Sequence, residues 1–222
     1  MGKRGPKPKN NIDTTWRPEL AYVVGLLAAD GCMSPAGHLI DLTSKDREQL
    51  ENFSKCVGIT NKIGRKRSGY NDGGVYLRVQ FKSVRFYEFL GSVGLTPNKS
   101  HTIGSLAIPD EYFWDFLRGL YDGDGSSNAY WDPRWKSSYM FYTNFVSASP
   151  NFIVWLREEI EKRISMSGSM TGPSTCRVIQ LKYAKDASRE ILRGMYYAEN
   201  VTCLSRKKLK VEKILATVGE RL

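Results

Sequence analysis

The sequence has few of the side chains that usually bind transition metals or act as catalytic nucleophiles. Two histidines and four cysteines occur in 222 residues, and no two cysteines lie at the spacing of a zinc site. A zinc centre and histidine-based catalysis are therefore disfavoured. Free thiols, buried or half-buried, fit a reducing compartment.

Long apolar runs are also missing from the sequence. No segment of about 18 apolar residues could cross a bilayer, and the N-terminus lacks the charged-then-apolar pattern of a secretion signal. We therefore expect no membrane partner, no secretion and synthesis in the cytosol.

Acidic residues are in deficit. Lysine and arginine number 33 against 23 aspartates and glutamates, which gives a net charge of +10. Such an excess favours a polyanionic partner, with nucleic acid as the first candidate and a merely soluble basic protein as the alternative. The opening MGKRGPKPKNN predicts a flexible basic arm over residues 1–14, which either contacts phosphates or the minor groove of DNA or is a tail that touches nothing.

Hydrophobic periodicity and turn residues predict one order of elements twice: helix, hairpin, helix, hairpin, helix. In a first half over residues 15–104, they are expected at 18–30, 38–42 with a turn at 35–37, 46–57 after a Thr43 or Ser44 cap, 61–81 and 84–93. In a second half over 105–222, they are expected at 109–124, 128–145, 150–164, 169–183 and 186–197, with a basic stretch at 206–213.

The first helix of each half contains a glycine in its middle. Glycine there costs roughly 1 kcal/mol relative to alanine, yet both Gly25 and Gly119 are present, each with a small residue four positions later (Ala29 and Gly123). Small residues at this spacing let two helices approach nearly backbone to backbone. The pattern therefore predicts that the two helices pack together with their C-terminal ends adjacent.

Each of these helices ends in an aspartate, Asp30 or Asp124, followed by glycine. An acid is unfavourable at a helix C-terminus, and two such acids brought together repel each other. Divalent cations between them would remove both penalties, and Mg²⁺ best suits carboxylate and carbonyl oxygens. The alternative is that each Asp-Gly pair is simply a turn after a helix.

The two segments VVGLLAADG at 23–31 and LRGLYDGDG at 117–125 resemble the signature helices of the LAGLIDADG homing endonucleases. The resemblance extends from about residue 15 to 215. It implies an α+β fold of two pseudo-symmetric α-β-β-α-β-β-α halves, each with a curved antiparallel DNA-binding sheet, packed through the motif helices. Two motifs in one chain imply a monomer that requires no protein partner.

The resemblance implies a site-specific endonuclease that hydrolyses both strands of double-stranded DNA at a long target and leaves short 3′ extensions. Two or three Mg²⁺ or other divalent cations would bind at the site. The protein would act in the cytoplasm or in the organelle of the mobile element that encodes it. Losing a motif acid is the expected mark of a non-cleaving binder on this fold, such as an intron maturase or a transcription regulator, and here both acids remain.

The family's functional positions fall on particular residues of this sequence. The metal ligands would be the carboxylates of Asp30 and Asp124 and the carbonyls of Ala29 and Gly123. The other catalytic residues would be Lys99 and Lys207 near the scissile phosphates, and Ser44, Lys45 and Ser147 where the family often has a water-orienting residue, commonly glutamine. Ala148 stands where the first half has Lys45, which suggests that the two strands are cut at unequal rates.

Alternation along the strands predicts the residues that contact DNA in the major groove. Tyr76, Arg78 and Gln80 should share one face. The full set, for each of which a merely solvated face is the alternative, is Arg65, Lys66, Arg67, Tyr76, Arg78 and Gln80 in the first half and Asn128, Tyr130, Arg134, Lys136, Tyr139, Arg177, Gln180 and Lys182 in the second.

Overall fold

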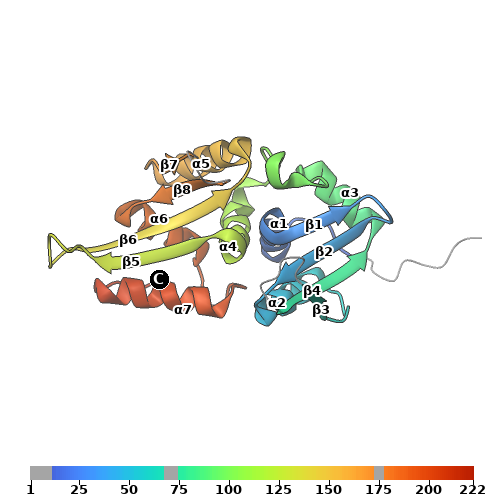
Figure 1. Cartoon of the computed structure of the whole chain (residues 1–222), viewed down its shortest axis with the longest axis horizontal. Coiled ribbons are helices and arrows are strands. Elements are labelled where there is room, and N and C mark those ends of the chain that lie inside the picture. The colour runs from blue at the N-terminus through green and yellow to red at the C-terminus, as the bar shows by residue number, and fades with distance from the viewer. Residues whose placement is uncertain (1–11, 68–74, 173–177) are drawn as a thin grey trace, which may run out of the picture.

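The computed structural model of the chain describes residues 12–67, 75–172 and 178–222, and it divides into two halves of like architecture (Figure 1). The first half contains α1 (Pro18–Asp30), β1 (Gly31–Ser34), β2 (Leu39–Ser44), α2 (Arg47–Val57), β3 (Gly64–Arg67), β4 (Val75–Lys82), α3 (Val84–Val93) and the short 3-10 helix η1 (Lys99–His101). The second contains η2 (Asp110–Tyr112), α4 (Phe113–Asp124), β5 (Ser126–Trp131), β6 (Tyr139–Ser147), α5 (Pro150–Ile164), β7 (Ser169–Thr171), β8 (Ile179–Tyr183), α6 (Lys185–Met195) and α7 (Ser205–Thr217).

The predicted order of elements is confirmed in both halves. Each half has one four-stranded antiparallel sheet, in the orders β1-β2-β4-β3 and β5-β6-β8-β7. The equivalent order relates the halves by pseudo-symmetry, and α7 is an addition to the second half. No helix among the residues described is long and apolar enough to cross a membrane.

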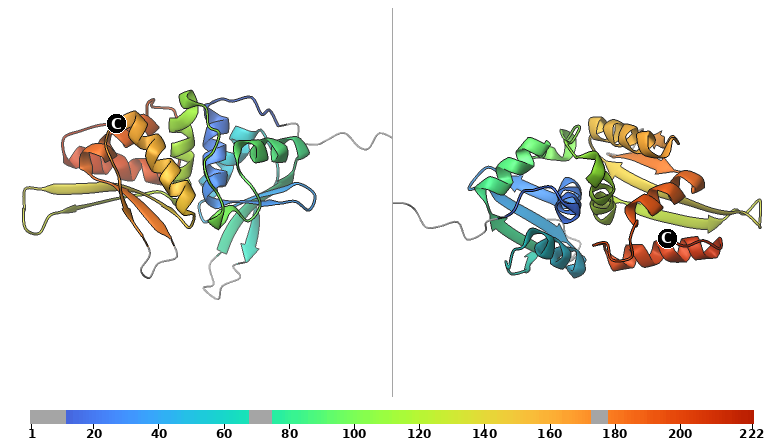
Figure 2. Two further views of the ribbon diagram at one scale, coloured as in Figure 1. Left: turned by 90° about the horizontal axis from the view of Figure 1, so that it is seen from above. Right: turned by 180° about the vertical axis from the view of Figure 1, so that it is seen from behind.

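Helices cover one face of each sheet and leave the other face open (Figure 2). Strand β4 shows how the sequence sets this arrangement, because its side chains alternate between the two faces. Val79 and Phe81 are buried against the helices, whereas Arg78 and Gln80 are only half-buried on the opposite face. The predicted alternation of Tyr76, Arg78 and Gln80 onto one face is confirmed.

The two motif helices α1 and α4 lie side by side at the centre of the molecule (Figure 1). A methyl group added at Gly25 would lie 2.1 Å from the Phe116 carbonyl oxygen, and one added at Gly119 would lie 2.0 Å from the Tyr22 carbonyl oxygen. Neither backbone could move away without separating the helices. The predicted close packing at the two glycines is therefore confirmed.

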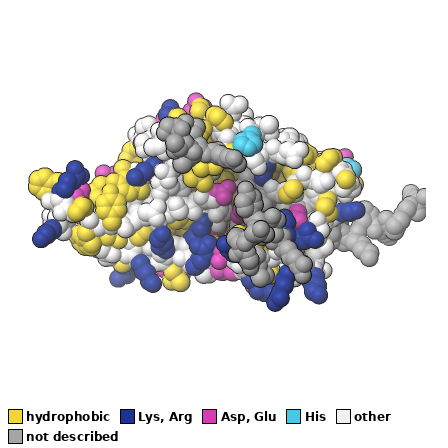
Figure 3. Space-filling view, viewed as in Figure 1, with side chains coloured by type: hydrophobic (Ala, Val, Ile, Leu, Met, Phe, Trp, Pro, Cys, Tyr) yellow, Lys and Arg dark blue, Asp and Glu magenta, His cyan; other side chains and the backbone are white. Residues whose placement is uncertain are grey.

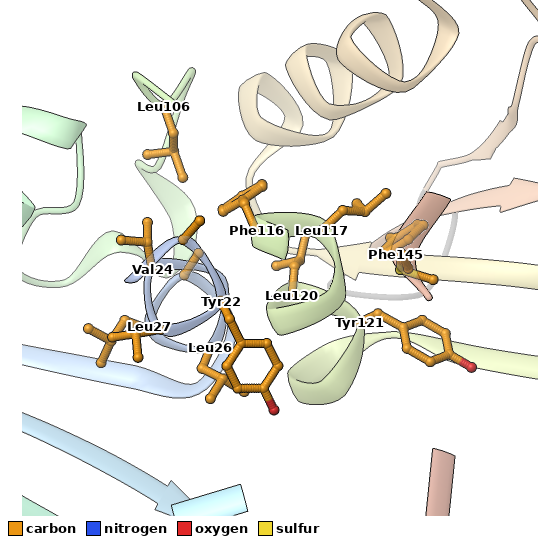
Figure 4. Packing of buried hydrophobic residues seen from close by; sticks show 14 of the residues in the cluster. Tyr22, Val24, Leu26, Leu27, Leu106, Phe116, Leu117, Leu120, Tyr121 and Phe145 are labelled. Atoms are coloured by element: carbon orange, nitrogen blue, oxygen red, sulfur yellow. The ribbon is translucent and has the colours of Figure 1, made fainter. Parts of the chain in front are cut away.

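Larger side chains pack around this contact between the two helices (Figure 4). Phe116 and Leu120 lie on the side of α4 that faces α1, whereas Tyr121 points away, toward Phe145 of the second sheet, at a ring distance of 6.3 Å. Tyr22 of α1 is fully buried. The core is thus continuous from one half to the other.

The structure differs from two sequence-based expectations, one about the residue that precedes α2 and one about the length of the N-terminal arm. The residue before α2 is Asp46 rather than Thr43 or Ser44, because the Ser44 hydroxyl accepts a hydrogen bond from the Asp46 amide and so shapes the turn into the helix. Ile12 is buried, so the folded part of the chain begins inside the predicted arm of residues 1–14. Residues 1–11 lie outside the described part.

Candidate active site

Asp30 and Asp124 end the two motif helices next to each other. Asp30 Oδ2 lies 3.3 Å from where a Cβ atom of Gly123 would be, so the first carboxylate reaches the end of the opposite helix. Burial, followed by the negative charge of Asp124, raises the pKa of Asp30 from 3.8 to about 6. Partial removal from water also raises the pKa of Asp124, although its side chain stays exposed on one side. The site holds more negative charge than its surroundings stabilise.

The donor atoms available here suit a hard divalent cation. They are the carboxylate oxygens of Asp30 and Asp124 and the carbonyl oxygens of Ala29 and Gly123, with no nitrogen or sulfur among them. Within the described residues, no group of three His, Cys, Asp or Glu side chains could enclose a metal ion. A cation would keep part of its shell for water or phosphate, as Mg²⁺ commonly does.

Two buried lysines stand at equivalent places in the halves. Lys99 Nζ donates to the Gly31 carbonyl oxygen at 2.6 Å, and Lys207 Nζ donates to the Gly125 carbonyl oxygen at 2.7 Å. Each glycine directly follows a motif aspartate. The geometry therefore supports Lys207 as the second-half counterpart of Lys99.

Lys207 is also bonded to the end of α4 itself. Its ammonium group donates to the carbonyl oxygens of Tyr121 at 2.5 Å and Gly123 at 3.1 Å, where a cation is favoured by the helix dipole. Burial lowers the pKa of Lys207 to about 8, and it lowers that of Lys99 too. Both positive charges are fixed in place beside the motif aspartates.

A glutamine that the sequence did not single out reaches Asp30. Gln49 Nε2 lies 3.4 Å from Asp30 Oδ2, and the Ser44 hydroxyl donates to Gln49 Oε1 at 2.8 Å. The hydroxyl thus orients the amide with its nitrogen toward the acid. Ser44 was expected where the family commonly has glutamine, and in this chain a glutamine five positions later contacts the motif acid. No spacing rule in the sequence would have indicated it.

The second half lacks this amide. The Ser147 hydroxyl accepts from the Ser149 amide at 3.1 Å, as the Ser44 hydroxyl accepts from the Asp46 amide at 3.0 Å, so the two serines are equivalent. Five residues after Ser147 stands Phe152, which is buried in the core. No side-chain amide in the described residues donates to Asp124, so the surroundings of the two acids differ at this position as well as at Ala148.

A cavity of about 320 Å³ opens beside Asp30, between the halves. Lys45 lies at its wall with its ammonium group 5.0 Å from the centre of the Tyr76 ring. The full lining is Asp30, Thr43, Ser44, Lys45, Asp46, Gln49, Tyr76, Asp122, Gly123 and Arg206.

Strand register sorts the first-half DNA candidates by face. Directly opposed residues of antiparallel strands share a face, and Lys66 opposes Tyr76 whereas Arg65 opposes Leu77. Lys66 therefore joins Tyr76, Arg78 and Gln80 on the open face, and Arg65 lies on the other one. Arg67 is paired with Val75 in the ladder.

An acid occupies the middle of this open face. Asp41 lies 3.6 Å from Arg78 and 4.0 Å from Lys66, and it accepts a hydrogen bond from Gln80 at 3.4 Å. No pattern in the sequence marks Asp41 as a site residue. Its neighbours become evident only from the pairing of β2 with β4 and of β4 with β3.

The second open face is rich in aromatic residues. The pairs Asn128–Tyr142, Tyr130–Met140, Lys182–Asn144 and Gln180–Val146 lie on it. Tyr142, which no pattern in the sequence singles out, stacks with Tyr130 at a ring distance of 6.1 Å and has the Lys182 ammonium group 3.7 Å from its ring centre.

Three other second-half candidates lie elsewhere. Tyr139 opposes Trp131 and packs against the core on the helix-covered face. Arg134 and Lys136 are exposed in the turn between β5 and β6, where Arg134 pairs with Asp132 at 3.1 Å. Arg177 lies outside the described residues.

Charge is unevenly distributed on the face at which the motif helices end (Figure 3). Acidic side chains lie near its middle, where the two halves meet, and many lysine and arginine side chains follow its lower edge. Basic side chains of both halves thus border a central acidic region on this face.

Comparison with known proteins identifies the architecture. A family model described as a LAGLIDADG-like domain matches residues 17–94. No curated protein matches the chain in sequence. Among solved structures, full-length DUF199/WhiA from Thermatoga maritima is 12% identical with a TM-score of 0.58, over 96% of this chain and 64% of that one, so the chain spans less than two thirds of WhiA.

Two DNA complexes are similar over nearly their whole length. The meganuclease I-SmaMI bound to uncleavable DNA is 14% identical with a TM-score of 0.60, over 92% of each chain. The homing endonuclease I-WcaI bound to its DNA recognition sequence is 12% identical with a TM-score of 0.58, over 94% of this chain and 95% of that one. At such identities the likeness concerns the fold.

Proposed function

Because this chain has the LAGLIDADG fold throughout and a LAGLIDADG-like domain in its first half, we propose that it is a site-specific endonuclease that cuts both strands of double-stranded DNA. The observation that supports this function best is the pair of motif acids. Asp30 and Asp124 meet at the ends of two closely packed helices, and each has a buried lysine on the next carbonyl group. A mere Asp-Gly turn would need neither the acid pair nor the lysines.

DNA would lie across the two open sheet faces, with the motif aspartates beneath its centre. Strands laid in the major groove present every second side chain to the base edges. We assign this role to the open-face residues, which are Lys66, Tyr76, Arg78, Gln80, Asn128, Tyr130, Tyr142, Gln180 and Lys182. One chain supplies both halves of the surface, so the protein would act as a monomer on a long site.

Asp30 and Asp124, with the carbonyls of Ala29 and Gly123, would hold divalent cations, for which Mg²⁺ is the best fit to the donor set. Bound there, Mg²⁺ would lower the pKa of a water molecule and neutralise charge on the phosphate being cut. Within the chain, Gln49 holds the Asp30 carboxylate in one orientation, and Ser44 fixes the amide of Gln49.

The two lysines would act on the phosphates through their positive charge. Lys99 and Lys207 place fixed positive charges beside the motif acids, where charge develops on the phosphate oxygens in the transition state. The side chains are already ordered by carbonyl acceptors before DNA binds. Hydrolysis on both strands would leave short 3′ extensions, as in the family that the motifs resemble.

Incubating the protein with a library of long random duplexes tests the proposal. We expect cleavage at one sequence in the presence of Mg²⁺, none with a chelator, and none with Asp30→Asn or Asp124→Asn. Sequencing the cut ends would reveal the extensions. If no duplex is cut although the same protein selects a sequence by binding, the nuclease proposal is wrong.

That outcome would favour the second candidate, a non-cleaving nucleic-acid binder such as a maturase or a transcription regulator. Two observations favour it. WhiA is similar in fold over 96% of this chain, and its structures are described by a LAGLIDADG domain and not as those of an endonuclease. The Asp124 side also has Phe152 where the Asp30 side has Gln49.

A further inference from the structure

Residues 202–206, which lead into Lys207, are hydrogen-bonded to α4 of the same half and to residues of the opposite half. Two attachments come from α4 of the same half. The Arg118 Nε donates to the Thr202 carbonyl oxygen at 2.8 Å, and Asp122 Oδ2 accepts from the Leu204 amide at 2.7 Å. Both side chains of α4 are buried, so this connection is part of the core.

Three more attachments come from α2 of the opposite half. Asn52 donates to the Cys203 carbonyl oxygen at 2.9 Å. Glu48 accepts from the Ser205 amide at 3.1 Å and also from the Ser205 hydroxyl. The first half therefore holds the start of α7, which lies beside α2 in Figure 1.

One more contact is the ion pair between Asp46, the residue before α2, and Arg206, the residue before Lys207. The Asp46 carboxylate accepts from Arg206 Nε at 2.9 Å and from its Nη2 at 2.6 Å. This bidentate contact fixes the orientation of the guanidinium group as well as its distance. Glu48 meanwhile places a negative charge at the N-terminus of α7, where the helix dipole favours it. Residues 202–206 are thus held by α4 and α2, and the next residue is Lys207.

Lys99 reaches its own glycine with far less support from the opposite half. In the structure as described, residues 96–102 take part in no side-chain hydrogen bond to the second half. The nearest such bond runs from the Ser149 hydroxyl to the Ile103 carbonyl oxygen. The two lysines are nevertheless equally buried, each at 8% exposure. They differ in how they are held rather than in how deep they lie.

We propose that Asp46 and Glu48 are positioning residues for Lys207, so that the first half of the chain orders the lysine of the second. Lys207 bonds to three carbonyl groups at the end of α4, and it can do so only while the first turn of α7 stays in place. Asp46 and Glu48 keep that turn in place from across the interface between the halves.

Chemical labelling of the free protein tests this without any DNA. An amine-reactive acetylating reagent, read out by mass spectrometry, reports how often each buried lysine opens to solvent. In the double variant Asp46→Asn with Glu48→Ala, we expect Lys207 to react about tenfold faster, the scale of lost hydrogen bonds to charged groups, and Lys99 to react at its original rate.

Glu51→Ala is the matched control. Glu51 lies on the same helix, and its ion pair is with Arg47 of α2 itself, both side chains being more than half exposed. This variant should leave both lysines as they were. Equal acceleration at Lys207 and Lys99 in the double variant would indicate general loosening and overturn the proposal, as would no acceleration at Lys207.

A second measurement rests on the proposed nuclease function. On a supercoiled plasmid that contains the selected target, the double variant should accumulate nicked circles, because one strand is cut more slowly than the other. The strand that is cut slowly should be the same one whose cleavage Lys207→Met slows. Equal slowing of both strands would contradict the proposal. If the wild-type protein cuts nothing, the nuclease function fails while the labelling result still decides the role of Asp46 and Glu48.

Discussion

At the scale of residues, the central feature is a pair of acids that the fold keeps together at a cost in stability. Asp30 and Asp124 sit close to one another at helix C-termini, and partial removal from water is the largest cause of the raised pKa of each, although the Asp124 side chain stays exposed. Lys99 and Lys207 offset part of that penalty. Structural needs alone would be met better by uncharged residues, which is why we assign the pair to function.

Replacing Asp30 by asparagine should stabilise the metal-free protein at pH 8. The pKa of Asp30 is raised to about 6, so protonation favours the folded state: this stability is complete below about pH 4 and is lost as the pH rises through 6. Asparagine mimics the protonated form, and the gain at pH 8 should be about 3 kcal/mol. Urea unfolding in a chelator at pH 8 and pH 4 measures it.

The gain should disappear at pH 4, where the wild-type carboxyl is itself protonated. Glu51→Gln, on the exposed side of α2, serves as the control and should change stability little at either pH. A variant Asp30→Asn that is less stable than the wild type at pH 8 would show that the carboxylate is well stabilised in the free protein.

Gln49 should make the cleavage rates of the two strands of a DNA target unequal. It bonds to Asp30, whereas Phe152 occupies the equivalent place near Asp124. Removing a side chain that orients a metal ligand typically costs roughly 10- to 100-fold in activity or metal affinity. We expect Gln49→Ala to slow one strand by about that factor, as measured by end-labelled duplexes, and Ser147→Ala to slow the other strand less. Equal slowing of both strands by Gln49→Ala would be inconsistent with this role.

At the scale of elements, the two halves differ in the length of their first hairpins as well as in α7. The turn between β1 and β2 spans residues 35–38, whereas that between β5 and β6 spans residues 132–138. The longer hairpin projects beyond the body of the second half (Figure 1). Its turn contains Trp135, which is 70% exposed, flanked by Arg134 and Lys136.

Trp135→Ala should weaken DNA binding without unfolding the protein. Truncating a large aromatic side chain at an interface commonly costs more than about 1 kcal/mol, so we expect a loss of about tenfold in affinity and a protected site that shortens at one end. Fluorescence anisotropy and footprinting measure these effects. Val154→Ala, which truncates an exposed side chain on α5, should leave both unchanged. An unshortened footprint would place the tip away from DNA.

At the scale of the whole molecule, one contact between two helices holds the halves together and forms the site. Gly25 and Gly119 set the distance between α1 and α4, and the same contact puts Asp30 beside the end of α4. The first half reaches across again through α2, which binds the start of α7. Stability of the interface and geometry of the site are therefore coupled.

Gly25→Ala should destabilise the protein although alanine is the better helix former. The added methyl would lie 2.1 Å from a backbone oxygen of α4, and such overpacking costs about 1–3 kcal/mol or more. Gly91→Ala in α3 is the matched control, because no atom lies within 4 Å of the added methyl, and it should stabilise by up to about 1 kcal/mol. Denaturant unfolding compares the two, and equal effects would refute the close contact.

The sequence by itself determined the order of elements, the pairing of the motif helices and the two central acids. These features are local, because hydrophobic period, turn residues and a costly glycine are each visible within one segment. It also indicated Lys99 and Lys207, through their resemblance to known positions. Alternation along β4 correctly grouped Tyr76, Arg78 and Gln80, because a strand's own side chains alternate whatever its partner is.

The tertiary structure decided everything that depends on register and on distant segments meeting. Which face Arg65 and Tyr139 take follows from the pairing of their strands, and a shift of one residue would reverse it. Asp41 and Gln49 became site residues only when β4 and α1 were placed beside them. The support that Asp46 and Glu48 give to Lys207 joins residues about 160 positions apart, so no local pattern could have predicted it.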